Sequence, residues 1–214
     1  MNNDIETIVF DLGQVIIDVD FNASIRAFQA LNVENATELM QDDEHVNILH
    51  QFEKGEIDTN GFRDAIRQIA GNRLPDEQID TAWEAMLGHI PSSRLQLIHE
   101  INKIFSTFLL SNTNPIHLKA IYYYVANEHE AFSFNKIFQA EYYSFQLGMR
   151  KPDPAIFWHI LNQNNLNAAN TLFLDDSSEH IESAKRLGMK TIKVDKQHDL
   201  VSILNRLKAD YGHV

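Results

Sequence analysis

Near its amino terminus the chain reads Ile8-Val9-Phe10-Asp11-Leu12-Gly13, an apolar run that ends in a carboxylate and a turn. Polar residues recur at three later points, which are Ser111-Asn112, Lys151-Pro152 and Asp175-Asp176. In an open parallel sheet the carboxyl ends of the strands line one crevice, where such folds bind ligands. We therefore expect side chains that lie far apart in the sequence to meet in one site.

Short apolar runs rich in Val, Ile, Phe and Leu are typical of buried strands. They cover residues 5–10, 105–110, 137–142, 171–174 and 191–194. Segments with apolar residues three and four apart, which is helical spacing, alternate with the later runs. They cover residues 95–104, 117–125, 154–161, 181–187 and 200–207. This alternation predicts an α/β fold, in which a parallel sheet is flanked by helices on both faces.

Residues 18–89 interrupt the alternation with helical patterns alone. Lys54-Gly55 followed by Asp58, and Gly71 followed by Pro75-Asp76, are each typical of one helix ending and the next beginning. We therefore predict two domains. Residues 1–17 and 90–214 form the core, and residues 18–89 form an inserted all-helical domain.

Composition limits the classes of function. The chain has 214 residues and a mass of 24.6 kDa, which fits one core domain with a modest insertion. A formal net charge of -12 argues against nucleic acid or an anionic membrane as the main partner. Because Cys is absent, any metal must be held by oxygen or imidazole. The sequence shows neither a secretory signal nor an apolar span of membrane length, so we expect a cytoplasmic protein.

The pair Asp175-Asp176 directly follows an apolar run. Adjacent carboxylates at a buried strand end repel each other unless a cation neutralises them. A helix N-cap explains one carboxylate but not two. Among hard divalent cations, which take oxygen ligands, Mg2+ fits best, so the pair predicts a magnesium site.

The other three points have ordinary explanations when each is taken alone. A strand-end Asp such as Asp11 commonly caps a turn, Ser111-Asn112 suits a turn before a helix, and most lysines are solvated. The functional alternative is an anion site. Ser111-Asn112 offers a hydroxyl, an amide and backbone N–H groups, and Lys151, held between turns, presents a compact positive charge suited to a phosphate.

Taken in order, the motifs resemble those of the haloacid dehalogenase superfamily. They are Asp-Leu-Gly-Gln-Val at 11–15, Ser-Asn at 111–112, Gly-Met-Arg-Lys-Pro at 148–152 and Asp-Asp-Ser at 175–177. The helical insertion resembles the small cap of that superfamily. More narrowly, these motifs and Phe52-Glu53-Lys54-Gly55-Glu56-Ile57 resemble the sugar-phosphate phosphatase branch that includes alpha-D-glucose-1-phosphate phosphatase.

The resemblance implies a Mg2+-dependent phosphatase that hydrolyses a small phosphorylated metabolite, such as a hexose 1-phosphate, through an aspartyl-phosphate. It assigns Asp11 as the nucleophile and a metal ligand. The Gly13 carbonyl and Asp176 complete the protein's ligands, with Asp175 on the metal or directly behind it. It also implies that Ser111 and Asn112 bind the transferring phosphoryl group, while Lys151 binds and neutralises it.

The chain departs from the superfamily pattern at Gly13. Many of these phosphatases carry a second Asp there, as general acid for the leaving group and base for water, and such a group is worth on the order of 10² to 10⁴ in rate. A sugar 1-phosphate tolerates its loss better than most esters, because an anomeric hydroxyl leaves readily. Cap residues His45, His50 and Glu53 are candidates to replace it.

Two other functions remain open at this point. A metal-independent 2-haloacid dehalogenase also uses a strand-end Asp without a second Asp beside it, although Asp175-Asp176 argues against this chemistry. A non-catalytic phosphate-ester binding protein is the alternative from a different class. We expect a monomer or a weak homodimer, since aromatic residues at helical spacing, such as those at 122–124, are more often core than contact surface.

Overall fold

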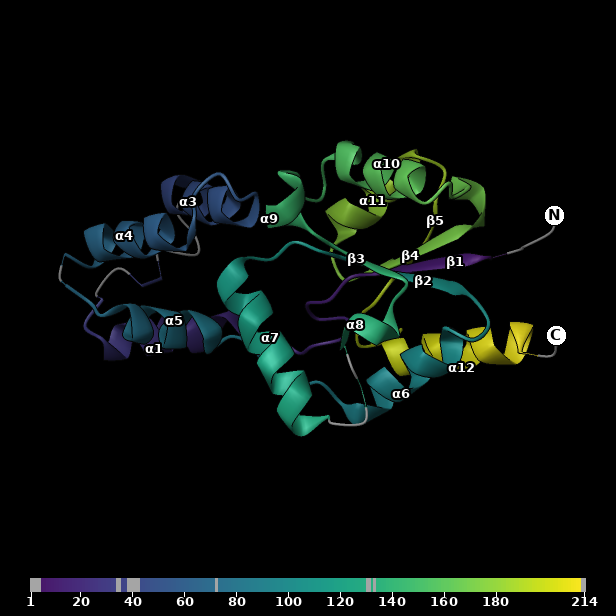
Figure 1. The fold of residues 1–214 in the computed structure, drawn as a ribbon, viewed down its shortest axis with the longest axis horizontal. Coiled ribbons are helices and arrows are strands. Elements are labelled where there is room, and N and C mark those ends of the chain that lie inside the picture. Colours follow the sequence, from purple (N-terminus) through teal and green to yellow (C-terminus); the bar gives the residue numbers. More distant parts are fainter. Residues whose placement is uncertain are drawn as a thin grey trace.

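The computed structural model describes residues 5–33, 36–37, 43–71, 73–129, 132 and 134–212, apart from the side chains of residues 43–46 and 134–135. His45, one of the candidate acids, is therefore outside the described side chains. Within the described part, five parallel strands form one sheet in the order β3-β2-β1-β4-β5 (Figure 1). The strands are β1 (Thr7–Phe10), β2 (Ser106–Ser111), β3 (Ala140–Tyr143), β4 (Thr171–Asp175) and β5 (Lys190–Lys193).

Strand register places the predicted polar residues at one edge of the sheet. Phe10, the last residue of β1, lies between Leu109 of β2 and Leu174 of β4. The chain then continues in register, because the backbone N–H of Asp11 donates to the carbonyl of Leu174 at 2.9 Å. Residues that follow β1, β2 and β4 therefore converge at the carboxyl edge, as the sequence predicts for a parallel sheet.

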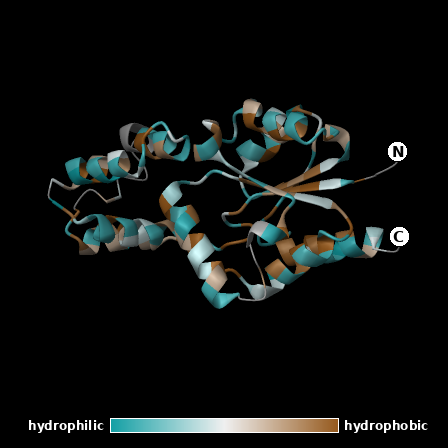
Figure 2. Ribbon diagram, in the orientation of Figure 1, coloured by the Kyte–Doolittle hydropathy of each residue, from teal (hydrophilic) through white to brown (hydrophobic). Residues whose placement is uncertain are grey.

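Helices cover both faces of the sheet. Ile8 and Phe10 belong to an apolar cluster with helices α6 (Ser92–Ile101), α7 (Pro115–Glu128) and α12 (Leu200–Tyr211). Val9 points to the opposite face and packs in a second cluster with α10 (Pro154–Gln163) and α11 (Ser178–Arg186). Figure 2 shows the hydrophobic residues concentrated in the strands and on the helix faces turned toward them. The strands carry apolar residues in nearly continuous runs because both faces are buried.

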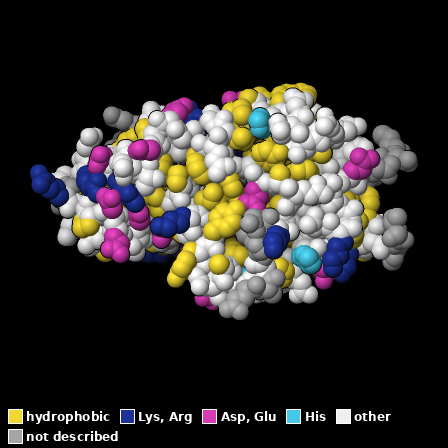
Figure 3. Space-filling model, in the orientation of Figure 1, with side chains coloured by type: hydrophobic (Ala, Val, Ile, Leu, Met, Phe, Trp, Pro, Cys, Tyr) yellow, Lys and Arg dark blue, Asp and Glu magenta, His cyan; other side chains and the backbone are white. Residues whose placement is uncertain are grey.

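Four helices of the described chain lie between β1 and α6, and we call them the insertion helices. They are α1 (Phe21–Ala30), α3 (Asp43–Glu53), α4 (Thr59–Ala70) and α5 (Asp76–Glu84). They lie to one side of the sheet (Figure 1) and enclose their own apolar cluster, in which the rings of Phe52 and Phe62 stack at 4.4 Å. Figure 3 shows acidic and basic side chains interspersed over them. None of the described helices is long and apolar enough to cross a membrane.

Turn chemistry in the insertion follows the sequence prediction. Asp58 caps α4, where its carboxylate accepts the N–H of Gly61 at 2.8 Å. Gly71 ends the same helix in the left-handed conformation, with φ of 63°. Glycine adopts this conformation without the steric cost that a side chain brings. The predicted helix boundaries at both positions are confirmed.

The strand predicted over 137–142 begins later than expected. Ile137 ends the short helix α8 (Phe134–Ile137), and β3 starts at Ala140. Ile137 and Phe138 are buried in the same apolar cluster as Phe10, and the Ile137 carbonyl accepts the side-chain N–H of Asn102 at 3.0 Å. A buried turn and a buried strand give the same apolar pattern over a few residues, so the sequence does not separate them.

Candidate active site

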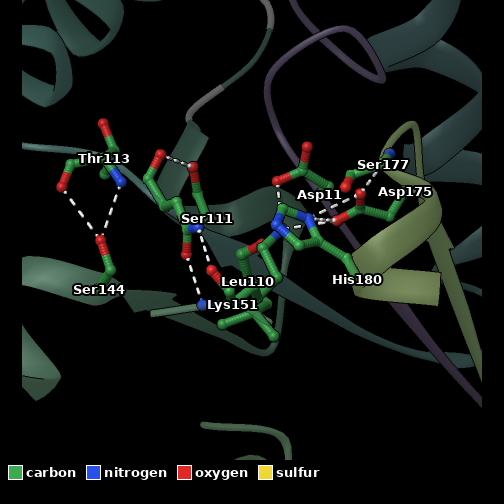
Figure 4. A network of polar contacts seen from close by, with 10 residues as sticks. Asp11, Leu110, Ser111, Thr113, Ser144, Lys151, Asp175, Ser177 and His180 are labelled. Carbon is green, nitrogen blue, oxygen red and sulfur yellow. Dashed lines mark hydrogen bonds and ion pairs between the residues drawn. The ribbon is translucent and has the colours of Figure 1, made fainter. Parts of the chain in front are cut away.

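Lys151 lies at the centre of the polar cluster. Its side chain is 0% exposed, and its ammonium donates to Asp11 Oδ1 at 2.6 Å, to Asp175 Oδ2 at 2.7 Å and to the carbonyl of Leu110 at 3.0 Å. These partners come from the ends of β1, β2 and β4, and Figure 4 shows them around the amine. All three donor positions of the ammonium are thus occupied by oxygen.

Burial and mutual charge together set the pKa values of Asp11, Lys151 and Asp175. Burial raises the pKa of Asp11 to about 7, against the opposing charge of Lys151. Burial alone would lower the pKa of Lys151, but Asp11 and Asp175 outweigh it and raise that pKa. For Asp175, burial is outweighed by the charge of Lys151 and by His180, so its pKa is lowered. The ammonium therefore stays charged inside the protein.

The carboxylates of Asp11, Asp175 and Asp176 form a set of oxygen donors suited to a metal ion. One ligand atom of each lies within 4.8 Å of the others. Three carboxylates face one ammonium, so the cluster keeps net negative charge, and its donors are the hard oxygens that Mg2+ prefers. The pKa of Asp176, raised by burial and by the charge of Asp175, reflects this crowding. The residues fit the divalent cation predicted from the sequence.

Asp175 and Asp176 differ in how much of each carboxylate is already engaged. Asp175 accepts the N–H of Ser177 at 2.8 Å, the Nδ1–H of His180 at 2.9 Å and the ammonium of Lys151 (Figure 4). Asp176 is only half-buried and lines an adjacent cavity of about 540 Å³. The geometry leaves Asp176 better placed than Asp175 to ligate a metal directly. The sequence gives no sign of the contact made by His180, the third residue of α11.

Asn112 uses its side chain on the backbone of Lys151. Its Nδ2–H donates to the Lys151 carbonyl at 2.9 Å, and its Oδ1 accepts the Lys151 N–H at 2.9 Å. Ser111 is buried beside it. The loop is fixed further by Ser144, whose hydroxyl accepts the N–H of Thr113 at 2.9 Å and donates to the Thr113 carbonyl at 3.1 Å (Figure 4). The Asn112 amide therefore positions Lys151 instead of pointing at a ligand.

Gly13 lies on the turn after Asp11. A Cβ at this position meets only Val19 Cγ2, at an ordinary contact distance of 3.6 Å. The left-handed residue of the turn is Gln14, with φ of 56°. Neither space nor backbone conformation therefore requires glycine at position 13. Packing does not explain why an acidic side chain is absent there.

A small cavity of about 170 Å³ lies between the insertion helices and the core, beside the polar cluster. The core contributes Gly13, Ser111 and Asn112, and the insertion contributes Glu53 and Trp83. Of the other two candidate acids from the insertion, His50 is not among the described lining residues, and the side chain of His45 is not described.

Glu53 joins the insertion to the core segment that carries Lys151. Its carboxylate accepts the Nε–H of Arg150 at 2.9 Å, and both side chains are about three-quarters buried. Burial raises the pKa of Glu53, while the charge of Arg150 opposes that rise. The pair connects residues that are 97 positions apart, and no local pattern in the sequence marks it.

His117 makes a second joint between the insertion and the core. This buried residue of α7 donates its Nε2–H to the Trp83 carbonyl of α5 at 3.0 Å, and Nδ1 faces the amide of Asn114 at 3.3 Å. The imidazole also stacks on the Trp83 indole at 4.8 Å. Burial lowers the pKa of His117 to about 4, so it is a neutral linker at ordinary pH.

The fold and the site together indicate a class of α/β hydrolases. In this class a parallel sheet carries an Asp, a Lys and paired acids at its carboxyl edge, and helices are inserted after the first strand. The chain belongs to the haloacid dehalogenase-like hydrolase family, which its residues 8–194 match. It is therefore a hydrolase, and the predicted superfamily and fold are confirmed. The narrower branch suggested by the motifs stays a prediction.

Known relatives agree with this family. A D-ribitol-5-phosphate phosphatase from Bacteroides thetaiotaomicron is 30% identical over 207 residues, which are 94% of this chain and 99% of that protein. A solved structure of a family enzyme from that organism, in complex with magnesium and inorganic phosphate, has a TM-score of 0.83 at 34% identity. That match covers 91% of this chain and 96% of the other.

More distant structures share the fold. A 2-haloacid dehalogenase from Pseudomonas syringae superposes with a TM-score of 0.61 at 18% identity, over 96% of this chain and 99% of its own. At this identity the likeness concerns the fold alone. It does not favour dehalogenation over phosphoryl transfer.

Proposed function

We propose that the chain is a Mg2+-dependent phosphatase that hydrolyses a small phosphorylated polyol or sugar through an aspartyl-phosphate on Asp11. The observation that carries this proposal is the buried ammonium of Lys151 between Asp11 and Asp175, whose carboxylates form a cluster with that of Asp176. The similarity to a D-ribitol-5-phosphate phosphatase supports a phosphorylated polyol. A hexose 1-phosphate is the narrower alternative within the same substrate class.

Asp11 attacks the phosphorus atom, forming an oxygen–phosphorus bond while the ester bond to the leaving alcohol breaks. Water then displaces Asp11 and releases inorganic phosphate. Asp11, the Gly13 carbonyl and Asp176 would hold Mg2+, which would supply positive charge against the repulsion between carboxylate and phosphate. Lys151 neutralises the phosphoryl oxygens, and the Ser111 hydroxyl with the backbone N–H of Asn112 binds them.

Asp175 has a supporting role in this proposal. It holds the ammonium of Lys151 from one side, and its own carboxylate is fixed by the contacts with Ser177 and His180. The side chain of Asn112 holds the Lys151 backbone from the other side. The phosphoryl-binding charge is thus preorganised before a ligand arrives, which is how electrostatic stabilisation lowers a barrier.

We also propose the two-domain division into a core of residues 1–17 and 90–214 and a cap of residues 18–89. The separate apolar cluster of the insertion helices supports it. The cavity that lies between insertion and core, beside Gly13 and Ser111, would receive the leaving group. A cytoplasmic location and a monomer or weak homodimer remain predictions from composition.

The proposal is tested by measuring phosphate release from D-ribitol 5-phosphate and glucose 1-phosphate, with Mg2+ and after chelation. We expect release that stops on chelation and returns when Mg2+ is restored, and none from Asp11→Asn. The carboxylate cluster disfavours a metal-independent dehalogenase, because nothing in that chemistry neutralises three acids. Binding of these esters without any release would instead support a non-catalytic binding protein.

A further inference from the structure

The segment Phe52–Ile57 docks the insertion onto the core. Phe52 is anchored in the apolar cluster of the insertion helices. Gly55 has φ of 67°, and a Cβ there would stand 2.3 Å from the carbonyl oxygen of Phe145 in α9 (Ser144–Leu147), so only glycine permits this approach. The docking fixes the end of α3 above the segment that leads to Lys151, and it places Glu53 against Arg150.

Charge is unevenly distributed over the walls of the 170 Å³ cavity. Most lining residues are apolar, and among the described ones Glu53 is the only residue with an acidic or basic side chain other than the neutral His117. A carboxylate in such surroundings needs hydrogen-bond donors beyond its ion pair. The Arg150 contact involves Oε2, which leaves Oε1 as an acceptor for a ligand.

The same cavity is lined by a residue with an unsatisfied donor. The indole Nε1 of Trp83 is buried and has no hydrogen-bond partner among the described residues. A buried N–H without a partner is costly, and a structure that keeps one requires an explanation. That nitrogen is closed off from the cavity, whereas a hydroxyl group within the cavity can donate a hydrogen bond to the Glu53 carboxylate.

We infer that Glu53, positioned by Arg150, selects substrates whose leaving group carries hydroxyls, by accepting a hydrogen bond from one of them. This inference rests on the proposed phosphatase function. An alkyl leaving group would cover the carboxylate without satisfying it, and sites built to hydrogen-bond a hydroxyl reject analogues that lack it. The guanidinium of Arg150 opposes the rise in pKa that burial causes in Glu53, and it fixes the direction in which the carboxylate points.

The test compares D-ribitol 5-phosphate with pentyl phosphate, which has the same number of carbons and no hydroxyls. We expect Glu53→Gln to lower kcat/KM for the ribitol ester at least about tenfold, mainly through a higher KM, and to change that for pentyl phosphate less than about twofold. Arg150→Met should raise the same KM, because Glu53 then loses the partner that orients it.

Glu56→Gln is the matched control. It removes the same charge from the same segment, but Glu56 is exposed and pairs with Lys54 outside the cavity, so neither ester should be affected. If Glu53→Gln does not fold, Glu53→Asp keeps the charge and withdraws it by one methylene, and the same selective loss is expected.

Equal losses for both esters in Glu53→Gln, or no loss for either, would overturn this inference and leave the phosphatase proposal standing. Absence of phosphate release by the unchanged chain from every ester would overturn the proposed function, and the inference with it.

Discussion

Lys151 concentrates the chemistry of the site in one buried charge. Its ammonium has three oxygen partners and no exposure to solvent, and its backbone is held by both hydrogen-bonding groups of the Asn112 amide. The place of this lysine between two turns predicts that its charge points into the crevice at the end of the sheet. The orientation of Asn112 is not predictable, because an amide after a strand has the same sequence pattern whether it points to a ligand or to a neighbouring backbone.

Asn112→Ala tests this positioning role. Two hydrogen bonds to the Lys151 backbone are lost, so we expect the free energy of unfolding to fall by about 2 kcal/mol. We also expect kcat/KM to fall by a factor of about 10 to 10², because the ammonium shifts. Urea unfolding and steady-state phosphate release measure the two effects. Asn164→Ala, which loses hydrogen bonds to Tyr142 and Ile160 but no contact with a residue of the polar cluster, should reduce stability alone. Full activity in Asn112→Ala would contradict the role.

Gly13→Asp tests whether the chain lacks a general acid. The position has room for a side chain and an ordinary backbone, so the variant should fold. We expect turnover of pentyl phosphate to rise at least about tenfold, because an alkoxide needs a proton to leave, and turnover of p-nitrophenyl phosphate to change little. Unchanged turnover of pentyl phosphate would mean that proton donation does not limit this enzyme.

At the scale of elements, strands that are buried along their whole length are easier to predict than contacts between helices. β1, β2 and β4 lie within two residues of their predicted bounds because continuous apolar runs mark them. The predicted start of β3 is wrong because a buried turn precedes the strand. The contacts of the insertion with the core, through Glu53 and His117, depend on the tertiary approach of distant helices, which no local periodicity encodes.

Gly55→Ala tests the docking of the insertion, with Gly71→Ala as its matched control. Both glycines are left-handed, so each substitution costs roughly 1 kcal/mol in backbone strain. A Cβ at position 71 would meet no atom within 4 Å, whereas a Cβ at position 55 would meet the Phe145 carbonyl. We therefore expect both variants to lose stability, and only Gly55→Ala to lower kcat/KM for D-ribitol 5-phosphate as well. Equal effects of the two variants would show that the contact is unimportant.

His117 predicts a pH dependence of stability. Its pKa is about 4 in the folded chain and near 6.5 when unfolded, so the unfolded state binds more protons between these values. The contribution is therefore complete above about pH 6.5 and declines by about 3 kcal/mol as the pH falls toward 4. Urea unfolding across this range should show a shallower slope in His117→Gln than in the exposed control His99→Gln. Identical slopes in the two variants would contradict a lowered pKa of His117 in the folded chain.

At the scale of the whole molecule, the parallel sheet explains how residues from 11 to 176 form one site. Each polar group follows a strand or precedes a helix, and the strand register brings the ends together. The order of the motifs therefore allows the fold and the meeting of the paired acids with Asp11 and Lys151 to be predicted. The cavity beside the polar cluster is not predictable in this way, because it forms only where the insertion meets the core.

The central claim is that Asp11 carries the phosphoryl group during turnover. Its most direct test is the intact mass of the chain after acid quenching during turnover of D-ribitol 5-phosphate with Mg2+, followed by peptide mapping. We predict a chain that gains one phosphoryl group at Asp11, and no such gain in Asp11→Asn. Continued phosphate release by Asp11→Asn, or a phosphoryl group on another residue, would contradict the account.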